Sequence, residues 1–481
     1  MTSGLKRYKM LEAGEVLAFL CQRGYRDRIW KMELDMGTVK DFTKGSPAKG
    51  IMLFALPLML GNLFQQLYTM VDTIIVGQGV GVNALASLGA ADWLSWMVLG
   101  LMTGLTQGFG ILFSQFYGAG DIAKLKKSIG DACIVVIAAL VLLTTAAELA
   151  IEPVLRVLNT PADVYGGAVL YLRILFAGIP VSLLYNFASA MLRSLGDGKS
   201  PLYAMVCASC VNIGLDSLFV LGLKWGIAGA AVATIIAQGV SLLYCVRVIR
   251  GISVLHIQRE DLHPDKRMIV KLLGLGLPIM FQNTIISVGG MVVQCVINGF
   301  GVLFVAGFTA TNKLYGILEV AAISYGFSVT TYVAQNYGAG DYGRIRKGIR
   351  AGIGLALATS CVISAFMFLC GRMILSMFIS APEPEGGTVL GIAWHYLQIM
   401  SVFLMVLYLL YVYRAALQGL GNTLVPMVSG FVELIMRVAA VMILPRFFGE
   451  EGLFWAEVMA WAGAAAILAV AYYVEMKRKE P

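Results

Sequence analysis

Long apolar stretches constrain the fold of this chain more than any other feature. Each has about twenty or more residues and few charges, enough to cross roughly 30 Å of hydrocarbon as a helix rising 1.5 Å per residue. The chain is 59% hydrophobic and 13% charged, whereas soluble proteins are about 25% charged. The sequence therefore predicts an all-α integral membrane protein with little material left for a soluble domain. The twelve expected spans are roughly 50–76, 86–115, 128–150, 164–190, 201–223, 226–249, 268–298, 303–335, 348–370, 388–416, 422–445 and 452–475.

The distribution of basic residues predicts the orientation. Connections after even-numbered spans are rich in lysine and arginine, whereas those after odd-numbered spans hold only Arg156, Lys224, Arg372 and Arg446. The positive-inside rule then places both termini in the cytoplasm of a multi-pass cell-membrane protein. Because topology explains the net charge of +8, no nucleic-acid partner is expected. The scattered cysteines argue against a disulfide framework or a zinc site.

The chain divides into regions of different composition. The polar N-terminal arm is expected to be cytoplasmic and poorly ordered, and Met36 within it could serve as an alternative translation start. The expected regions are the arm (1–49), an N-lobe (50–249), a cytoplasmic linker (250–267), a C-lobe (268–475) and a cytoplasmic tail (476–481).

Three motifs recur in the same order at nearly one spacing, which indicates a duplicated six-span unit. An even number of spans gives both copies the same orientation, so a pseudo-two-fold axis along the membrane normal should relate the lobes. Substrate should then bind between them. The motifs are LPLMLGN at 56–62 and LPIMFQN at 277–283, SQFYGAGD at 114–121 and AQNYGAGD at 334–341, and LRSLGDGKSP at 192–201 and LQGLGNTLVP at 417–426.

Two carboxylates interrupt apolar spans of the first half. Asp72 lies in the first span, and Asp216 lies in the fifth, four residues after Asn212. Residues four apart share one face of a helix. Carboxylates are costly inside a bilayer and rarely face lipid, so the pair is predicted to be the functional centre. A purely structural role, in which each acid only bonds a neighbouring helix, is the alternative.

With these motifs, the chain resembles the multidrug and toxic compound extrusion (MATE) family over about residues 40 to 475. The resemblance implies a V-shaped pair of six-helix lobes. It also implies alternating access and export of organic cations and other amphipathic compounds, driven by proton or sodium entry. In the prokaryotic branch that the chain most resembles, the coupling site lies in the N-lobe. Other branches use C-lobe carboxylates beginning in the seventh span, which has none here. The matching coupling positions are Asp72, Asn212, Asp216, Thr234 and Tyr171.

These five residues fall at similar depth. Counted at 1.5 Å per residue from the expected outer ends of the spans, they lie about 7 to 16 Å below the outer surface. Their hard oxygen donors suit Na⁺ or a shared proton better than a transition metal, so Asp72, Asn212, Asp216 and Thr234 could hold Na⁺. Burial and mutual repulsion disfavour two ionised carboxylates, so the pair is expected to titrate as a unit. Pro57 removes one backbone hydrogen bond, so it is a candidate hinge of the first span. Bending at this hinge, once the coupling site is occupied, is expected to release the drug.

The second half lacks the acidic set. At the repeat offsets, Asp72 corresponds to Val293 and Asp216 to Val441. Glu433 and Arg437, which are four residues apart, are expected to form an ion pair within one helix. Other charged residues of this half are candidates for a central substrate cavity. The candidates, with that pair, are Lys313, Glu319 and Glu457.

Several alternatives stay open. A flippase for a lipid-linked or polysaccharide precursor is the nearest rival, although more spans and a more cationic cavity would be expected of it. An enzyme is disfavoured, because no HExxH or GxSxG motif is present. The two YGAGD loops are expected to be tight turns, with a gate as the other interpretation. We expect no cofactor apart from the coupling H⁺ or Na⁺, small organic substrates, contact with membrane lipid, and a monomer.

Overall fold

The computed structural model describes residues 39–158, 160–379 and 385–479. Its helices confirm the predicted all-α membrane fold. Within the described residues, eleven helices are long and apolar enough to cross a membrane, and the number is twelve if one bent pair is counted as a single span. Met36 and the rest of the arm up to residue 38 lie outside the described residues.

The first half contains the bent pair. It consists of α6 and α7, which meet at 49°. Gly178 ends α6, and Pro180, which has no N–H to donate, stands in the first turn of α7, so the backbone hydrogen-bond ladder stops there. The bounds are α3 Pro47–Gly79, α4 Val82–Gly118, α5 Ile122–Val157, α6 Ala162–Ala177, α7 Ile179–Ser194, α8 Lys199–Asp216, a π-helix η1 Ser217–Gly222 and α9 Ile227–Ile249.

The second half repeats this order after a linker with two short 3₁₀ helices, Ser253–Leu255 and Arg259–Leu262. Pro278 of α10 corresponds to Pro57 of α3, and both helices run through their proline without interruption. Both helices are therefore continuous at the proline in this conformation. The bounds are α10 Lys266–Ile297, η4 Asn298–Phe300, α11 Val302–Gly338, α12 Tyr342–Phe378, α13 Glu385–Gly419, α14 Leu424–Ile443, α15 Pro445–Phe448 and α16 Glu451–Arg478.

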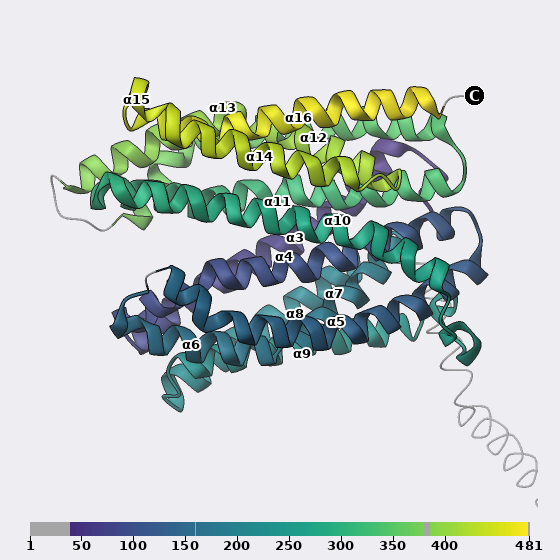
Figure 1. Ribbon diagram of the computed structural model, residues 1–481, viewed down its shortest axis with the longest axis horizontal. Coiled ribbons are helices and arrows are strands. Elements are labelled where there is room, and N and C mark those ends of the chain that lie inside the picture. Colours follow the sequence, from purple (N-terminus) through teal and green to yellow (C-terminus); the bar gives the residue numbers. More distant parts are fainter. Residues whose placement is uncertain (1–38, 159, 380–384, 480–481) are drawn as a thin grey trace, which may run out of the picture.

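The helices form two lobes of roughly parallel long rods, α3 to α9 in one and α10 to α16 in the other (Figure 1). Each lobe has its own buried apolar core. The first helix of each lobe also packs against the other lobe, α10 against α4 and α3 against α11. Accordingly, Phe54 and Leu58 of α3 belong to the C-lobe core, while Met268 and Leu272 of α10 belong to the N-lobe core.

The chain before α3 is packed between the lobes. Phe42 is 1% exposed and lies edge-on against Phe54 and Tyr332. Its N–H donates to Gln335 Oε1 at 2.8 Å, and the Lys40 N–H donates to the Leu195 carbonyl at 3.0 Å. The prediction of a poorly ordered arm is therefore wrong for these residues, because one buried ring and several backbone hydrogen bonds fix them.

Candidate functional site

The acidic site lies inside the N-lobe, where α3 packs against α8. Asp72 is 7% exposed, and Asp216 and Asn212 are fully buried. Asp216 is the last residue of α8, and the π-helix begins at the next residue. π-helical turns are rare and occur frequently at functional sites. The predicted meeting of the two acids is supported, since Asp216 lies within electrostatic range of Asp72.

The polar atoms of this site are unusually short of partners. Among the described residues, none bonds Asp72 Oδ1, either oxygen of Asp216, or either polar atom of the Asn212 amide. Leaving a buried donor or acceptor unpaired costs about 1 to 3 kcal/mol, and more for a charged group. Natural folds rarely leave several such atoms unpaired in one place. A proton or a cation bound among these oxygens would satisfy them.

Two tyrosines border the acids. Tyr171 on α6 lies within electrostatic range of Asp72, Asp216 and Tyr68. Tyr68 precedes Asp72 by one turn of α3 and therefore shares its helix face. Thr234 lies half-buried on α9, which packs against α8, but none of the described hydrogen bonds joins it to the acids. The structure thus brings together four of the five predicted side chains, whereas no described hydrogen bond connects Thr234 to them. The four are Asp72, Asn212, Asp216 and Tyr171.

Asp92 on α4 is a third carboxylate that sequence reasoning missed. It lies within electrostatic range of Asp72 in its own lobe and of Lys313 in the other. Asp92 and Lys313 are both exposed, although charges within spans rarely face lipid. Because they belong to opposite lobes and lie within electrostatic range of one another, they face each other across the lobe interface. The sequence could have identified this residue, because Asp92 is the only charged residue in the expected second span, 86–115.

The C-lobe holds buried charges of a different kind. The predicted ion pair between Glu433 and Arg437 within α14 is wrong. Glu433 pairs with Arg414 of α13, and Arg437 pairs with Glu457 of α16 at 2.7 Å. The pattern differs because both α14 side chains face the lobe interior, where neighbouring helices present opposite charges.

These paired charges are buried. Glu433 is 3% exposed and Arg437 is 5% exposed, so they line no open cavity in this conformation. Glu319 of α11 is only half-buried, and it accepts a hydrogen bond of 2.7 Å from the Tyr411 hydroxyl. Of the other candidate cavity residues, Lys313 is exposed, and Glu457 is half-buried like Glu319 but is paired with Arg437.

Breaking the buried C-lobe network should reduce stability. Arg414→Met leaves the Glu433 charge without its guanidinium, and such a loss costs about 3 kcal/mol or more. Arg156→Met removes the exposed pair with Glu152, in which the side chains are 72% and 43% exposed, and should cost less than about 1 kcal/mol. Thermal unfolding of the purified protein in detergent would compare the two. Equal midpoints for both variants would contradict the role of the buried pair.

The lobes meet at the end where the two repeated loops lie. The Gln115 amide of α4 donates to the Gly419 carbonyl of α13 at 3.1 Å, and the Gln335 amide of α11 donates to the Ser194 carbonyl of α7 at 2.9 Å. Gln115 corresponds to Gln335 in the repeat, and Ser194 corresponds to Gly419. The two hydrogen bonds are therefore one contact made twice, once by each lobe.

The repeated loops are tight turns, as predicted, and they also permit this contact. Gly120 and Gly340 adopt φ angles of 71° and 73°, which favour glycine. A Cβ added at Gly118 would overlap the backbone oxygen of Gln335, and a Cβ added at Gly338 would overlap that of Gln115. Glycine thus allows α4 and α11 to cross in contact at this end.

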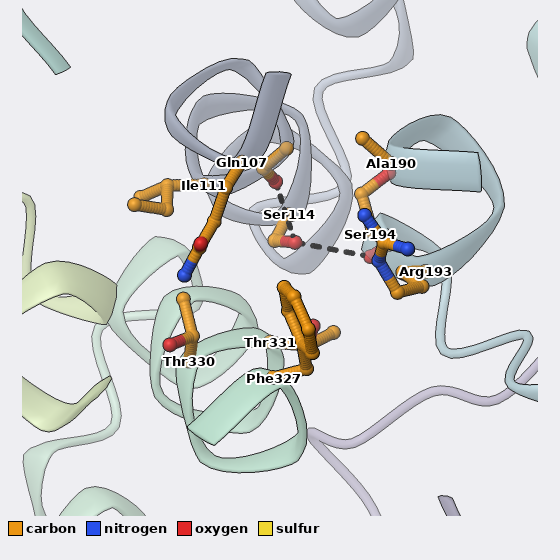
Figure 2. A pocket seen from close by; sticks show the side chains of 10 residues that line it. Gln107, Ile111, Ser114, Ala190, Arg193, Ser194, Phe327, Thr330 and Thr331 are labelled. Atoms are coloured by element: carbon orange, nitrogen blue, oxygen red, sulfur yellow. Dashed lines mark hydrogen bonds between the residues drawn. The ribbon is translucent and has the colours of Figure 1, made fainter. Parts of the chain in front are cut away.

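A small cavity lies next to this crossing, between α4, α7 and α11 (Figure 2). Its volume of about 20 Å³ is enough for about one water molecule. Arg193 stacks over the Phe327 ring at 4.6 Å and donates to Ser189 Oγ at 2.6 Å. The repeat partners of Arg193 and Phe327 are Gln418 and Gln107, and they also meet across the interface at 3.2 Å. The closed end, where the lobes meet, is therefore polar and pseudo-symmetric, and the cavity inside this contact is small.

Two repeated lobes of membrane-spanning helices, with buried carboxylates inside one of them, are typical of a secondary transporter. The MatE family model matches residues 57–218 and 278–443. The chain belongs to this family of membrane transporters.

Known relatives cover most of the chain. The probable multidrug resistance protein YpnP of Bacillus subtilis is 29% identical over 86% of this chain and 92% of its own length. The multidrug export protein MepA of Staphylococcus saprophyticus is 21% identical over 87% and 92%. A solved outward-facing multidrug resistance MATE family transporter superimposes with a TM-score of 0.85 at 23% identity, covering 92% of this chain and 99% of that one. At that identity, the superposition shows the shared fold.

Proposed function

We propose that this protein is an antiporter that exports drug-like, often cationic amphipathic compounds in exchange for H⁺ or Na⁺. The observation that carries the proposal is the cluster of unpartnered buried oxygens at Asp72 and Asp216. Such a cluster has no stabilising role until it takes up a cation, because each unpaired atom costs free energy. The YpnP and MepA relatives, which are described as multidrug resistance and export proteins, support drug-like compounds as the substrate class.

The closed end is the cytoplasmic end in this proposal, since the lysine-rich connections lie there. The substrate space is then open toward the outside and contains Asp92, Lys313 and Glu319. Two of these three charges are negative, which favours cationic compounds.

Helix α3 links the coupling site to the lobe interface. It carries Asp72 in its outer half, and Asn62, nearly three turns earlier, donates to Ser324 Oγ of α11 at 3.2 Å. Uptake of one cation removes one negative charge from the acid pair and lets α3 repack against α8. Pro57 leaves one carbonyl of α3 without a partner, so the helix can bend there at low cost. A shift of α3 therefore reaches the contact between the lobes.

The test is ethidium efflux from a pump-deficient bacterial strain that expresses the protein, with the proton and sodium gradients collapsed separately. We expect efflux that stops when one of the two gradients is removed, which would name the coupling ion. Efflux that survives the loss of both gradients would contradict antiport. If the protein exports no dye, the precursor-flippase alternative becomes the leading explanation.

A further inference from the structure

A groove of about 670 Å³ opens at the basic end of the molecule, beside the repeated contact between the lobes. Ligand sites in proteins are typically about 300 to 1,000 Å³, so the groove could hold a headgroup of several heavy atoms. One wall is α4 of the N-lobe. The other walls are α10, Tyr337 at the end of α11, the turn between α13 and α14, and the end of α16, all from the C-lobe.

The groove is amphipathic with a positive balance. Its charged lining residues are Lys271, Lys479 and Glu475. Glu475 lies 3.2 Å from Lys479 and also accepts from the Asn422 amide at 3.3 Å, while Lys479 donates to the Tyr337 hydroxyl at 3.1 Å. The Glu475 and Lys479 charges therefore offset one another, and Lys271 supplies the excess positive charge. Lys271 is exposed on α10, and Arg267 lies one turn before it on the same face. The surplus charge therefore favours an anionic group.

The rim of the groove faces the lipid. Leu424, which lines it, is 60% exposed, and Val428 one turn further along α14 is 49% exposed. Val270, next to Lys271 on α10, is 60% exposed as well. Apolar side chains exposed on two spans contact acyl chains in a bilayer. An occupant could therefore enter from the membrane, with a charged head in the groove and an apolar tail along α14.

We propose that the groove binds the headgroup of an anionic phospholipid of the inner leaflet, with its phosphate met by Lys271 and Lys479. Basic pockets between spans on the cytoplasmic side recognise such headgroups through the same combination of charge and membrane depth. The inner-leaflet assignment rests on the proposed orientation, whereas the binding chemistry does not.

The site also bears on the lobe interface. Gln115 lines the groove, and its amide makes one of the two repeated hydrogen bonds between the lobes. Because both lobes contribute walls to the groove, a lipid should bind more tightly when the lobes meet at this end than when they separate there. Bound lipid therefore favours the closed state at this end, to the extent that its affinity for that state exceeds its affinity for the open one.

Binding can be measured without transport. The purified protein is equilibrated in detergent with equal amounts of phosphatidylglycerol and phosphatidylcholine of matched chains, and retained lipids are counted by native mass spectrometry. We expect wild type to keep phosphatidylglycerol preferentially. The K271A/K479A variant should retain about fivefold less for each lysine removed. The K126A/K347A variant removes two lysines of the same end outside the groove and should match wild type.

A second variant tests the groove without changing its charge. A Cβ added at Gly274 meets no atom within 4 Å, so G274L should fold and fill the groove, and we expect it to lower phosphatidylglycerol retention. Equal retention of both lipids by wild type would overturn the proposal. So would wild-type retention by a monodisperse K271A/K479A or by G274L. Displacement of the lipid by millimolar inorganic phosphate would identify free phosphate as the occupant and overturn the lipid assignment.

Discussion

Replacing Asp216 by Asn is expected to lower ion-coupled efflux about a hundredfold while the protein still folds. Asparagine has nearly the same shape but carries no charge, so a cation held by both acids loses one charged partner in a water-poor site. Losing such an interaction costs about 3 kcal/mol, which corresponds to about a hundredfold in affinity. Asp72→Asn should have a similar effect, because the two carboxylates lie within range of one another and act as a pair.

The matched control for these variants is Asp163→Asn. Asp163 is exposed in the first turn of α6 in the same lobe, so its charge contributes little to the buried site. Dye efflux at equal membrane expression and the thermal unfolding midpoint in detergent would separate loss of coupling from loss of folding. If Asp216→Asn and Asp72→Asn export the dye as wild type does, the acid pair has only a structural role and the coupling site lies elsewhere.

Replacing Gly118 or Gly338 by Ala is expected to keep the lobes from closing at the basic end. The added methyl group would meet a backbone oxygen of the opposite helix, and backbone cannot move aside as a flexible side chain can. Overpacking of this kind costs about 1 to 3 kcal/mol. Since closure is part of the transport cycle in our proposal, we expect efflux to fall about tenfold or more.

Thiol labelling would report the closure directly. Ser194 is 2% exposed beside the repeated contact, so a Ser194→Cys probe in a background without the native cysteines should react slowly with a maleimide. Gly118→Ala should accelerate that reaction. Gly354→Ala is the control, because a Cβ at this glycine of α12 meets open space. Unchanged labelling and unchanged efflux in both Gly118→Ala and Gly338→Ala would show that the close crossing of α4 and α11 is not needed for transport.

The sequence by itself predicted the spans because crossing a membrane requires a local property, about twenty apolar residues in succession. It predicted the two lobes because the motifs recur within the chain. It also singled out Asp72 and Asp216, since a carboxylate in an apolar run stands out without any knowledge of its neighbours. Asp92 was visible in the same way and was overlooked.

Only the tertiary structure decided which groups meet. Glu433 and Arg437 looked like partners because they are one turn apart, but α13 and α16 supply their counter-charges. The Gln115 and Gln335 hydrogen bonds join residues separated by 304 and 141 positions, and the buried position of Phe42 depends on helices of the other lobe. Local spacing specifies the face of a helix, whereas the partner on that face depends on which distant helix packs there.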